Sequence, residues 1–166
     1  MRPGASAVAA GPDAVVADLP MCIDFLPDGR LLVVSSADRR LLRREPYGSV
    51  VPHADLAAVS TKPWNDIVVD GRGSAYVNSI GFDFPGEEFA PGIVVLVTYD
   101  GRVTPVAGGL AFPNGMAITA DGSTLIVAES YAEQLTAYDI ADGGPSPGAG
   151  SGPRPWASIR MGSVSM

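Results

Sequence analysis

Two asparagines, Asn65 and Asn114, are the residues of this sequence whose type and spacing offer metal chemistry. They lie 49 positions apart, in the segments Trp64-Asn-Asp-Ile-Val and Phe112-Pro-Asn-Gly-Met. Amide oxygens are hard, neutral ligands that suit Ca²⁺ and similar cations. The alternative is that both are turn residues, because Asn-Asp and Asn-Gly dipeptides tolerate a left-handed backbone. The residue types alone leave both interpretations open.

A repeated turn gives the two asparagines equivalent places in the chain. Aligning Gly122 of the Asp-Gly turn with Gly73 and Gly29 of two earlier turns gives spacings of 49 and 44 residues. These values are close to the ~40–45 residues of a four-stranded propeller blade. The same offsets align Asn114, Asn65 and Met21. The two asparagines should therefore begin the innermost strands of neighbouring blades and point at the top of a central channel.

The elements that must position these residues are short β-strands. Runs of β-branched and aliphatic residues alternate with turns rich in Gly, Pro and Asp, which is typical of an all-β fold. We expect about three four-stranded blades over residues 20–56, 57–110 and 111–140, preceded by a lead-in segment at 1–19. Residues 141–166 are rich in Gly, Pro and Ser, and we expect a flexible tail there.

Composition excludes several classes of function. The 166 residues carry 18 acidic and 11 basic side chains, for a net charge of -7, so we expect no nucleic-acid partner. No apolar run approaches the ~20 residues that cross a bilayer, so we expect no membrane partner either. The single cysteine, Cys22, cannot form an intramolecular disulfide and is interpreted as a core thiol. A cytoplasmic location follows as the expectation.

Several other polar residues were weighed as site candidates. The run with Arg39, Arg40, Arg43 and Arg44 is either a substrate patch or a solvated edge strand, and we favour the edge. The only histidine, His53, excludes paired-histidine zinc sites and is expected in an exposed loop. The long loop 81–92 carries three phenylalanines and several acids that could line a pocket mouth. We expect no catalytic residue among them and leave the substrate-binding residues unassigned.

The second and third units resemble the senescence marker protein-30/gluconolactonase family, which includes regucalcin-like proteins. The similarity lies in Trp64-Asn-Asp-Ile-Val-Val-Asp-Gly-Arg-Gly-Ser-Ala-Tyr-Val and in Phe112-Pro-Asn-Gly-Met-Ala-Ile-Thr-Ala-Asp-Gly. A weaker match, Leu26-Pro-Asp-Gly-Arg-Leu-Leu-Val, extends it over about residues 20–140. The resemblance implies a six-bladed β-propeller, of which this chain represents about half. It also implies one divalent cation in the channel, with Asn65 and Asn114 as two of its ligands.

The resemblance further implies a hydrolase of the lactonase type, acting on carboxylic ester bonds in a small lactone or sugar-acid-like substrate. The expected cation is Ca²⁺, with Zn²⁺, Mn²⁺ or Mg²⁺ as alternatives. The family's other two ligands are a glutamate before residue 20 and an aspartate after residue 140, and neither has a counterpart here. Pro63 also replaces an arginine that some members carry. We therefore expect weak metal binding and little activity. Tight binding would mean that another carboxylate completes the site, and Asp24 and Glu129 are the candidates.

The alternative function is a non-catalytic propeller fragment that associates with a partner or binds a cation or small molecule without turnover. Three isolated blades would leave the outer faces of the first and third units exposed to solvent. A second copy could cover those faces, so we expect either a homodimer or an insoluble protein. The residues expected on these faces are Ile23, Phe25, Val33, Ile118, Ile126 and Leu135.

Overall fold

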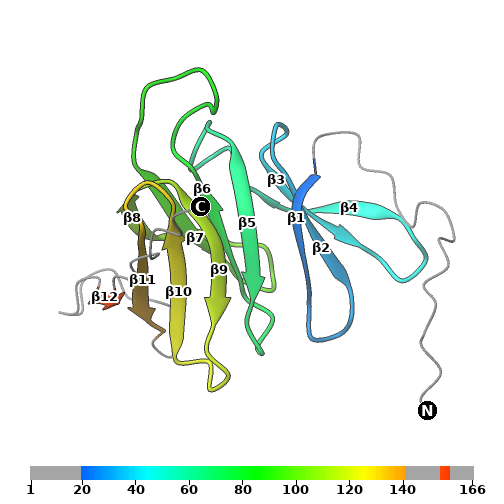
Figure 1. The fold of residues 1–166 in the computed structure, drawn as a ribbon. Helices are drawn as coiled ribbons and strands as arrows, with labels where there is room; N and C mark the ends of the chain where they lie inside the picture. The colour runs from blue at the N-terminus through cyan, green and yellow to red at the C-terminus, as the bar shows by residue number, and fades with distance from the viewer. Residues whose placement is uncertain (1–19, 141–153, 158–166) are drawn as a thin grey trace, which may run out of the picture.

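The computed structural model describes residues 20–140 and 154–157, and this part of the chain forms three four-stranded antiparallel sheets without a helix (Figure 1). The first sheet contains β1 (Pro20–Phe25), β2 (Leu31–Ser35), β3 (Arg40–Arg44) and β4 (Val50–Asp55). The second contains β5 (Trp64–Val69), β6 (Ala75–Ser79), β7 (Gly92–Val97) and β8 (Val103–Leu110). The third contains β9 (Pro113–Ile118), β10 (Thr124–Glu129), β11 (Gln134–Asp139) and β12 (Arg154–Ala157).

Each sheet is a meander in which consecutive strands pair, as in a propeller blade. The first strand of every sheet contacts the first strand of the next: β1 packs beside β5, and β5 beside β9. Figure 1 shows these three strands close together, with the later strands of each sheet extending away from them. The predicted all-β fold with about three propeller blades is confirmed.

The aligned glycines occupy the same turn in all three sheets. Gly29, Gly73 and Gly122 have φ values of 84°, 85° and 72°, which a side chain would strain. Each donates its N–H to the carbonyl three residues earlier, over 2.8, 3.0 and 2.8 Å respectively. Asn65 and Asn114 lie at the same distance before the aligned glycine, and each is the second residue of the inner strand that leads into the turn.

The third sheet extends further along the chain than the unit predicted for it. We placed that unit at 111–140, whereas its fourth strand, β12, comes from Arg154–Ala157. The segments 1–19, 141–153 and 158–166 lie outside the described residues. They contain the predicted lead-in and most of the predicted tail.

Two hydrophobic clusters fill the spaces between the sheets. Alternate residues of β6 and β7 point to opposite faces, so Ala75 and Val95 pack toward the first sheet while Tyr76 and Val94 pack toward the third. All five residues of β6 are buried as a result. Strand β10 instead alternates between half-buried and buried positions, because within residues 20–140 and 154–157 only one face of the third sheet has a neighbouring sheet.

The outer face of the first sheet is partly open. Ile23 and Phe25 on β1 are each 58% exposed, as expected for a blade face without a neighbour. Val33 was expected on the same open face, but it is only 4% exposed. Ile126 and Leu135 of the third sheet are half-buried, and Ile118, which was expected on the open face, packs instead against the cluster between the second and third sheets.

Candidate functional site

The two asparagines meet between the inner strands of the second and third sheets. Asn65 Nδ2 lies 3.4 Å from Asn114 Oδ1 and 3.4 Å from the carbonyl oxygen of Pro113. Asn114 in turn donates through Nδ2 to Ser130 Oγ over 3.3 Å. Asn65 is half-buried and Asn114 is exposed, so the pair is accessible from solvent. The structure thus brings together the two residues that were 49 positions apart.

Two polar side chains, the buried Asn78 and the half-buried Asp66, hold the strand that carries Asn114. Asn78, which is fully buried in β6, donates through Nδ2 to the Asn114 carbonyl over 2.7 Å. Asp66 Oδ2 accepts the Met116 N–H over 2.8 Å, and this bond links β5 to β9 two residues beyond Asn114. Hydrogen bonds of this kind hold the inner strands at a fixed separation, and with them the amide groups of Asn65 and Asn114.

The two carboxylates named above as candidates, Asp24 and Glu129, are engaged elsewhere. Asp24 accepts the Phe25 and Val69 N–H groups, both over 2.7 Å, and so links the first sheet to the second. Glu129 is 5% exposed and accepts the Ala111 N–H over 2.7 Å as well as bonds from Gln134 and Thr136. Among the described residues, no three His, Cys, Asp or Glu side chains gather where they could hold a metal ion.

The environment of Glu129 agrees with a structural role. Burial alone would raise the pKa of its carboxyl group, but hydrogen bonds from Thr136, Ala111 and Gln134 outweigh burial and lower that pKa. The carboxylate therefore stays charged and saturated with donors inside the third sheet. Its lone pairs are used within its own blade, which leaves it unsuited to complete a cation site at Asn65 and Asn114.

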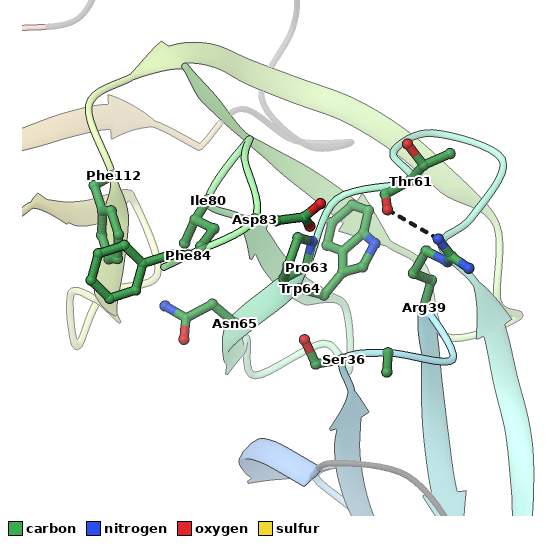
Figure 2. Close-up of a pocket in the computed structure, with 11 residues that line it drawn as sticks. Ser36, Arg39, Thr61, Pro63, Trp64, Asn65, Ile80, Asp83, Phe84 and Phe112 are labelled. Carbon is green, nitrogen blue, oxygen red and sulfur yellow. Dashed lines mark hydrogen bonds between the residues drawn. The ribbon is translucent and has the colours of Figure 1, made fainter. Parts of the chain in front are cut away.

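A pocket of about 380 Å³ opens beside Asn65 (Figure 2). It is built by the β2–β3 turn of the first sheet, the start of β5, the loop after β6 and the residue before β9. The lining residues are Ser36, Ala37, Arg39, Thr61, Pro63, Trp64, Asn65, Ile80, Asp83, Phe84 and Phe112. Because three sheets contribute to it, the pocket forms only when the blades pack together.

The loop after β6 is held over this pocket by charge and by aromatic packing. Lys62 Nζ lies 3.3 Å from Asp83 Oδ2 and 2.5 Å from Glu87 Oε2, and the bond to Glu87 is the main reason that the pKa of Lys62 is raised. Phe84 packs edge-on against Phe112 with ring centroids 5.3 Å apart. The loop 81–92, which the sequence offered as one that could line a pocket mouth, contributes Asp83 and Phe84 to the lining.

Cys22 is a poor nucleophile in this structure. Burial, a hydrogen bond to Asp66 and the negative charge of Asp66 together raise the pKa of its thiol to about 11. A free cysteine has a pKa of about 8.5, so we expect alkylation by iodoacetamide at pH 8 to be slower by on the order of a hundredfold than in the urea-unfolded chain. Asp66→Asn should recover part of the rate. Equal rates in the folded and unfolded chains would contradict this interpretation.

The sheets and the asparagine pair define a class of protein: a β-propeller whose inner strands converge on a possible ligand site. The chain belongs to the SMP-30/gluconolactonase/LRE-like family, whose model matches residues 7–162. This confirms the resemblance inferred from the two asparagine motifs. A search of curated protein sequences found no match.

Solved structures show the same fold. A luciferin-regenerating enzyme superposes with a TM-score of 0.66 at 20% identity, covering 86% of this chain and 48% of that one. A gluconolactonase from Xanthomonas campestris gives 0.65 at 22% identity, with coverages of 83% and 48%. The calcium-binding protein regucalcin from Agrobacterium tumefaciens gives 0.62 at 20% identity, with coverages of 76% and 41%. This chain therefore spans less than half the length of each of these structures.

The residues that shape the pocket could not be found from the sequence alone. Arg39 was interpreted as part of a solvated edge, but it lies in the β2–β3 turn, half-buried, and donates through Nη1 to the Thr61 carbonyl over 3.0 Å. Trp64 was noted only as part of the motif around Asn65. No sequence signal links the two, because their proximity depends on how the first sheet packs on the second.

In the described residues, no helix is long and apolar enough to cross a membrane.

Proposed function

We propose that this chain supplies about half of a divalent-cation-dependent lactonase, with Asn65 and Asn114 among the ligands of the cation. The proposal is supported by membership of the gluconolactonase family and by the convergence of the two amides from neighbouring inner strands. Substrates would be small lactones or sugar-acid-like esters, and the preferred cation would be Ca²⁺. We place the protein in the cytoplasm, where the free thiol of Cys22 would remain reduced.

The observation that carries the proposal is the 3.4 Å approach of the Asn65 and Asn114 amides beside the pocket that Asn65 lines. Their chemistry suits a hard cation, and rotating the Asn65 amide would direct its oxygen toward Asn114 Oδ1. Ser130 Oγ and the Pro113 carbonyl are further oxygen atoms beside the pair. The donor set is of the right type but too small, since Ca²⁺ takes 6–8 oxygen ligands.

The missing ligands limit what the chain does alone. A bound cation would supply carbonyl polarisation and a bound water of lowered pKa. The described residues would orient the lactone through the two amides and shield it through the aromatic wall of the pocket. We assign no acid or base to them, because Asp24, Asp66 and Glu129 are held by backbone donors. Full activity would require carboxylates from outside the described residues or from a second copy.

Cation binding tests the site directly. For the chain itself we expect a Kd for Ca²⁺ in the millimolar range or weaker, because two neutral oxygens resemble the weakest calcium sites. Asn114→Asp should tighten binding by about tenfold, since affinity follows the number of charged ligands. Asn114→Ala should abolish it. The matched control is Thr104→Asp, which adds the same charge at an exposed position on the outer strand β8.

Isothermal titration calorimetry with Ca²⁺ measures these affinities, and γ- and δ-lactones with Ca²⁺, Zn²⁺ or Mn²⁺ measure turnover. We expect turnover far below the 1–10³ s⁻¹ usual for enzymes. Two results would contradict the proposal: equal tightening by Thr104→Asp, which would mean that binding ignores the asparagine pair, or ordinary metal-dependent turnover in the Asn114→Ala variant.

A second candidate function is cation or small-molecule binding without turnover, or association with another protein. It is favoured by the absence of a carboxylate cluster from the described residues. The same experiments separate the two functions. Binding that responds to Asn114→Asp, with no turnover even when carboxylates are introduced at positions 65 and 114 together, would favour a binding module.

A further inference from the structure

Two buried hydrogen-bond donors in the pocket have no partner. Trp64 is fully buried, and its indole Nε1 lacks an acceptor. Arg39 Nε is also buried without an acceptor, although the same guanidinium donates to Thr61 through Nη1. Figure 2 shows the indole nitrogen on the side of the Trp64 ring that faces Arg39. Leaving a buried donor unpaired costs about 1–3 kcal/mol, so two in one pocket call for a ligand acceptor.

Backbone strain gathers at the same pocket. Only three non-glycine residues in the described part of the chain have a positive φ, and two of them, Arg39 at 54° and Phe112 at 59°, line this pocket. Such conformations cost on the order of 1–3 kcal/mol each and cluster at ligand sites, where surrounding structure enforces them. The strain holds one side chain at the polar end of the pocket and one in its apolar wall.

The charges of the pocket favour an anion. Trp64 Nε1–H and the Arg39 guanidinium only donate hydrogen bonds, so an oxygen with negative charge would satisfy both. The carboxylate of Asp83 does not compete for Arg39, because it is paired with Lys62. Opposite these donors the wall is apolar, with Pro63, Ile80, Phe84 and Phe112, while neutral polar groups come from Ser36, Thr61 and Asn65. The volume of about 380 Å³ lies at the small end of ligand pockets, which span roughly 300–1,000 Å³.

We infer that this pocket binds the carboxylate of a small, largely apolar organic acid between Trp64 and Arg39. The inference rests on the proposed function in one respect: Asn65 lines the same pocket, so the preferred lactone would carry a carboxylate away from its ester bond. The substrate class is thereby narrowed from lactones in general to anionic lactones with an apolar body.

The test uses 3-phenylpropionate as the probe and 3-phenylpropanamide as its neutral counterpart, with EDTA present so that no divalent cation contributes. The indole N–H of Trp64 is followed by NMR in the full chain, which has two tryptophans, and Trp156→Phe identifies its signal. We expect 3-phenylpropionate to shift the Trp64 signal and to bind at least about tenfold more tightly than the amide, because hydrogen bonds to a charged acceptor are the stronger ones.

Variants separate recognition from folding. Arg39→Gln should remove the preference for the carboxylate, while Arg40→Gln, at the exposed neighbouring position, should keep it. Trp64→Phe should reduce the difference between the affinities for the acid and the amide to less than tenfold. Thermal melting shows whether each variant is still folded. Equal affinities for acid and amide, an unmoved Trp64 signal, or an unchanged preference in Arg39→Gln would overturn the inference and leave a water molecule as the partner of the two donors.

The outcome is independent of the cation. Carboxylate binding in EDTA together with calcium binding that ignores Asn114 would support this pocket and contradict the proposed cation site. Calcium binding that follows Asn114 together with equal acid and amide affinities would contradict only the pocket inference.

Discussion

Gly81→Ala is expected to lower the free energy of unfolding by about 2 kcal/mol or more, the sum of a backbone strain and a clash. Gly81 has a φ of 91°, in the left-handed region that disfavours side chains. A Cβ atom there would lie 2.3 Å from the Pro91 carbonyl oxygen and 2.8 Å from that of Ala90. Both contacts are with backbone, so no side-chain rotation relieves them.

Urea denaturation of the variant and of the original chain measures this loss. Gly71→Ala is the matched control, because its Cβ would meet no heavy atom within 4 Å and its φ is not left-handed. We expect the control to change stability by less than about 0.5 kcal/mol. Gly81 also begins the loop that carries Asp83 and Phe84, so its replacement should disturb the Trp64 N–H signal. Equal stabilities for the two variants would mean that the loop adjusts freely.

The repeat could be predicted from the sequence because local chemistry defines it. Each aligned glycine lies in a turn with the same hydrogen bond, and the inner strand before the turn keeps the same distance from that glycine in the second and third sheets. That regularity places Asn65 and Asn114 at equivalent positions, and the packing of β5 against β9 then brings them together. A local signal repeated at the right interval was therefore enough to predict that both asparagines begin neighbouring inner strands.

The environments of residues outside such a repeat could not be predicted. Arg39 lies in a run of arginines that resembles a solvated edge, and only the packing of the first sheet on the second brings it to Trp64. His53 was expected in an exposed loop, but it lies in β4, where Arg43 Nη1 is 3.1 Å from its Nδ1 and burial lowers its pKa. Val33 was expected on an open face and is buried. In each case the residue type was compatible with both environments.

The open face of the first sheet leads to a proposal about assembly. Ile23 and Phe25 project from β1 with 58% of their surfaces exposed, and β1 has a neighbouring inner strand, β5, on one side only within the described residues. Related structures of the same fold are about twice as long, since this chain covers 48% of two of them. Two copies related by a two-fold axis along the channel would supply six blades, each copy's third sheet covering its partner's first.

This arrangement also bears on the proposed cation site. Two copies would bring four asparagine amides to one channel, together with any carboxylates that the partner presents there. A closed ring would also bury the apolar blade faces at about 25 cal/mol per Å², which favours association. We therefore expect the soluble protein to be a dimer, and insolubility to be the result where pairing fails, because large exposed apolar patches promote aggregation.

Size-exclusion chromatography with light scattering is expected to give twice the 17.1 kDa mass of one chain. Phe25→Asp should abolish this species, because a buried, unpaired carboxylate at the contact costs several kcal/mol. The matched control is Tyr47→Asp, which places the same charge on a fully exposed side chain between β3 and β4 and should leave the dimer intact. A monodisperse, cooperatively melting particle of 17.1 kDa in the original chain would contradict the dimer, because the exposed face of β1 would then be stable without a partner.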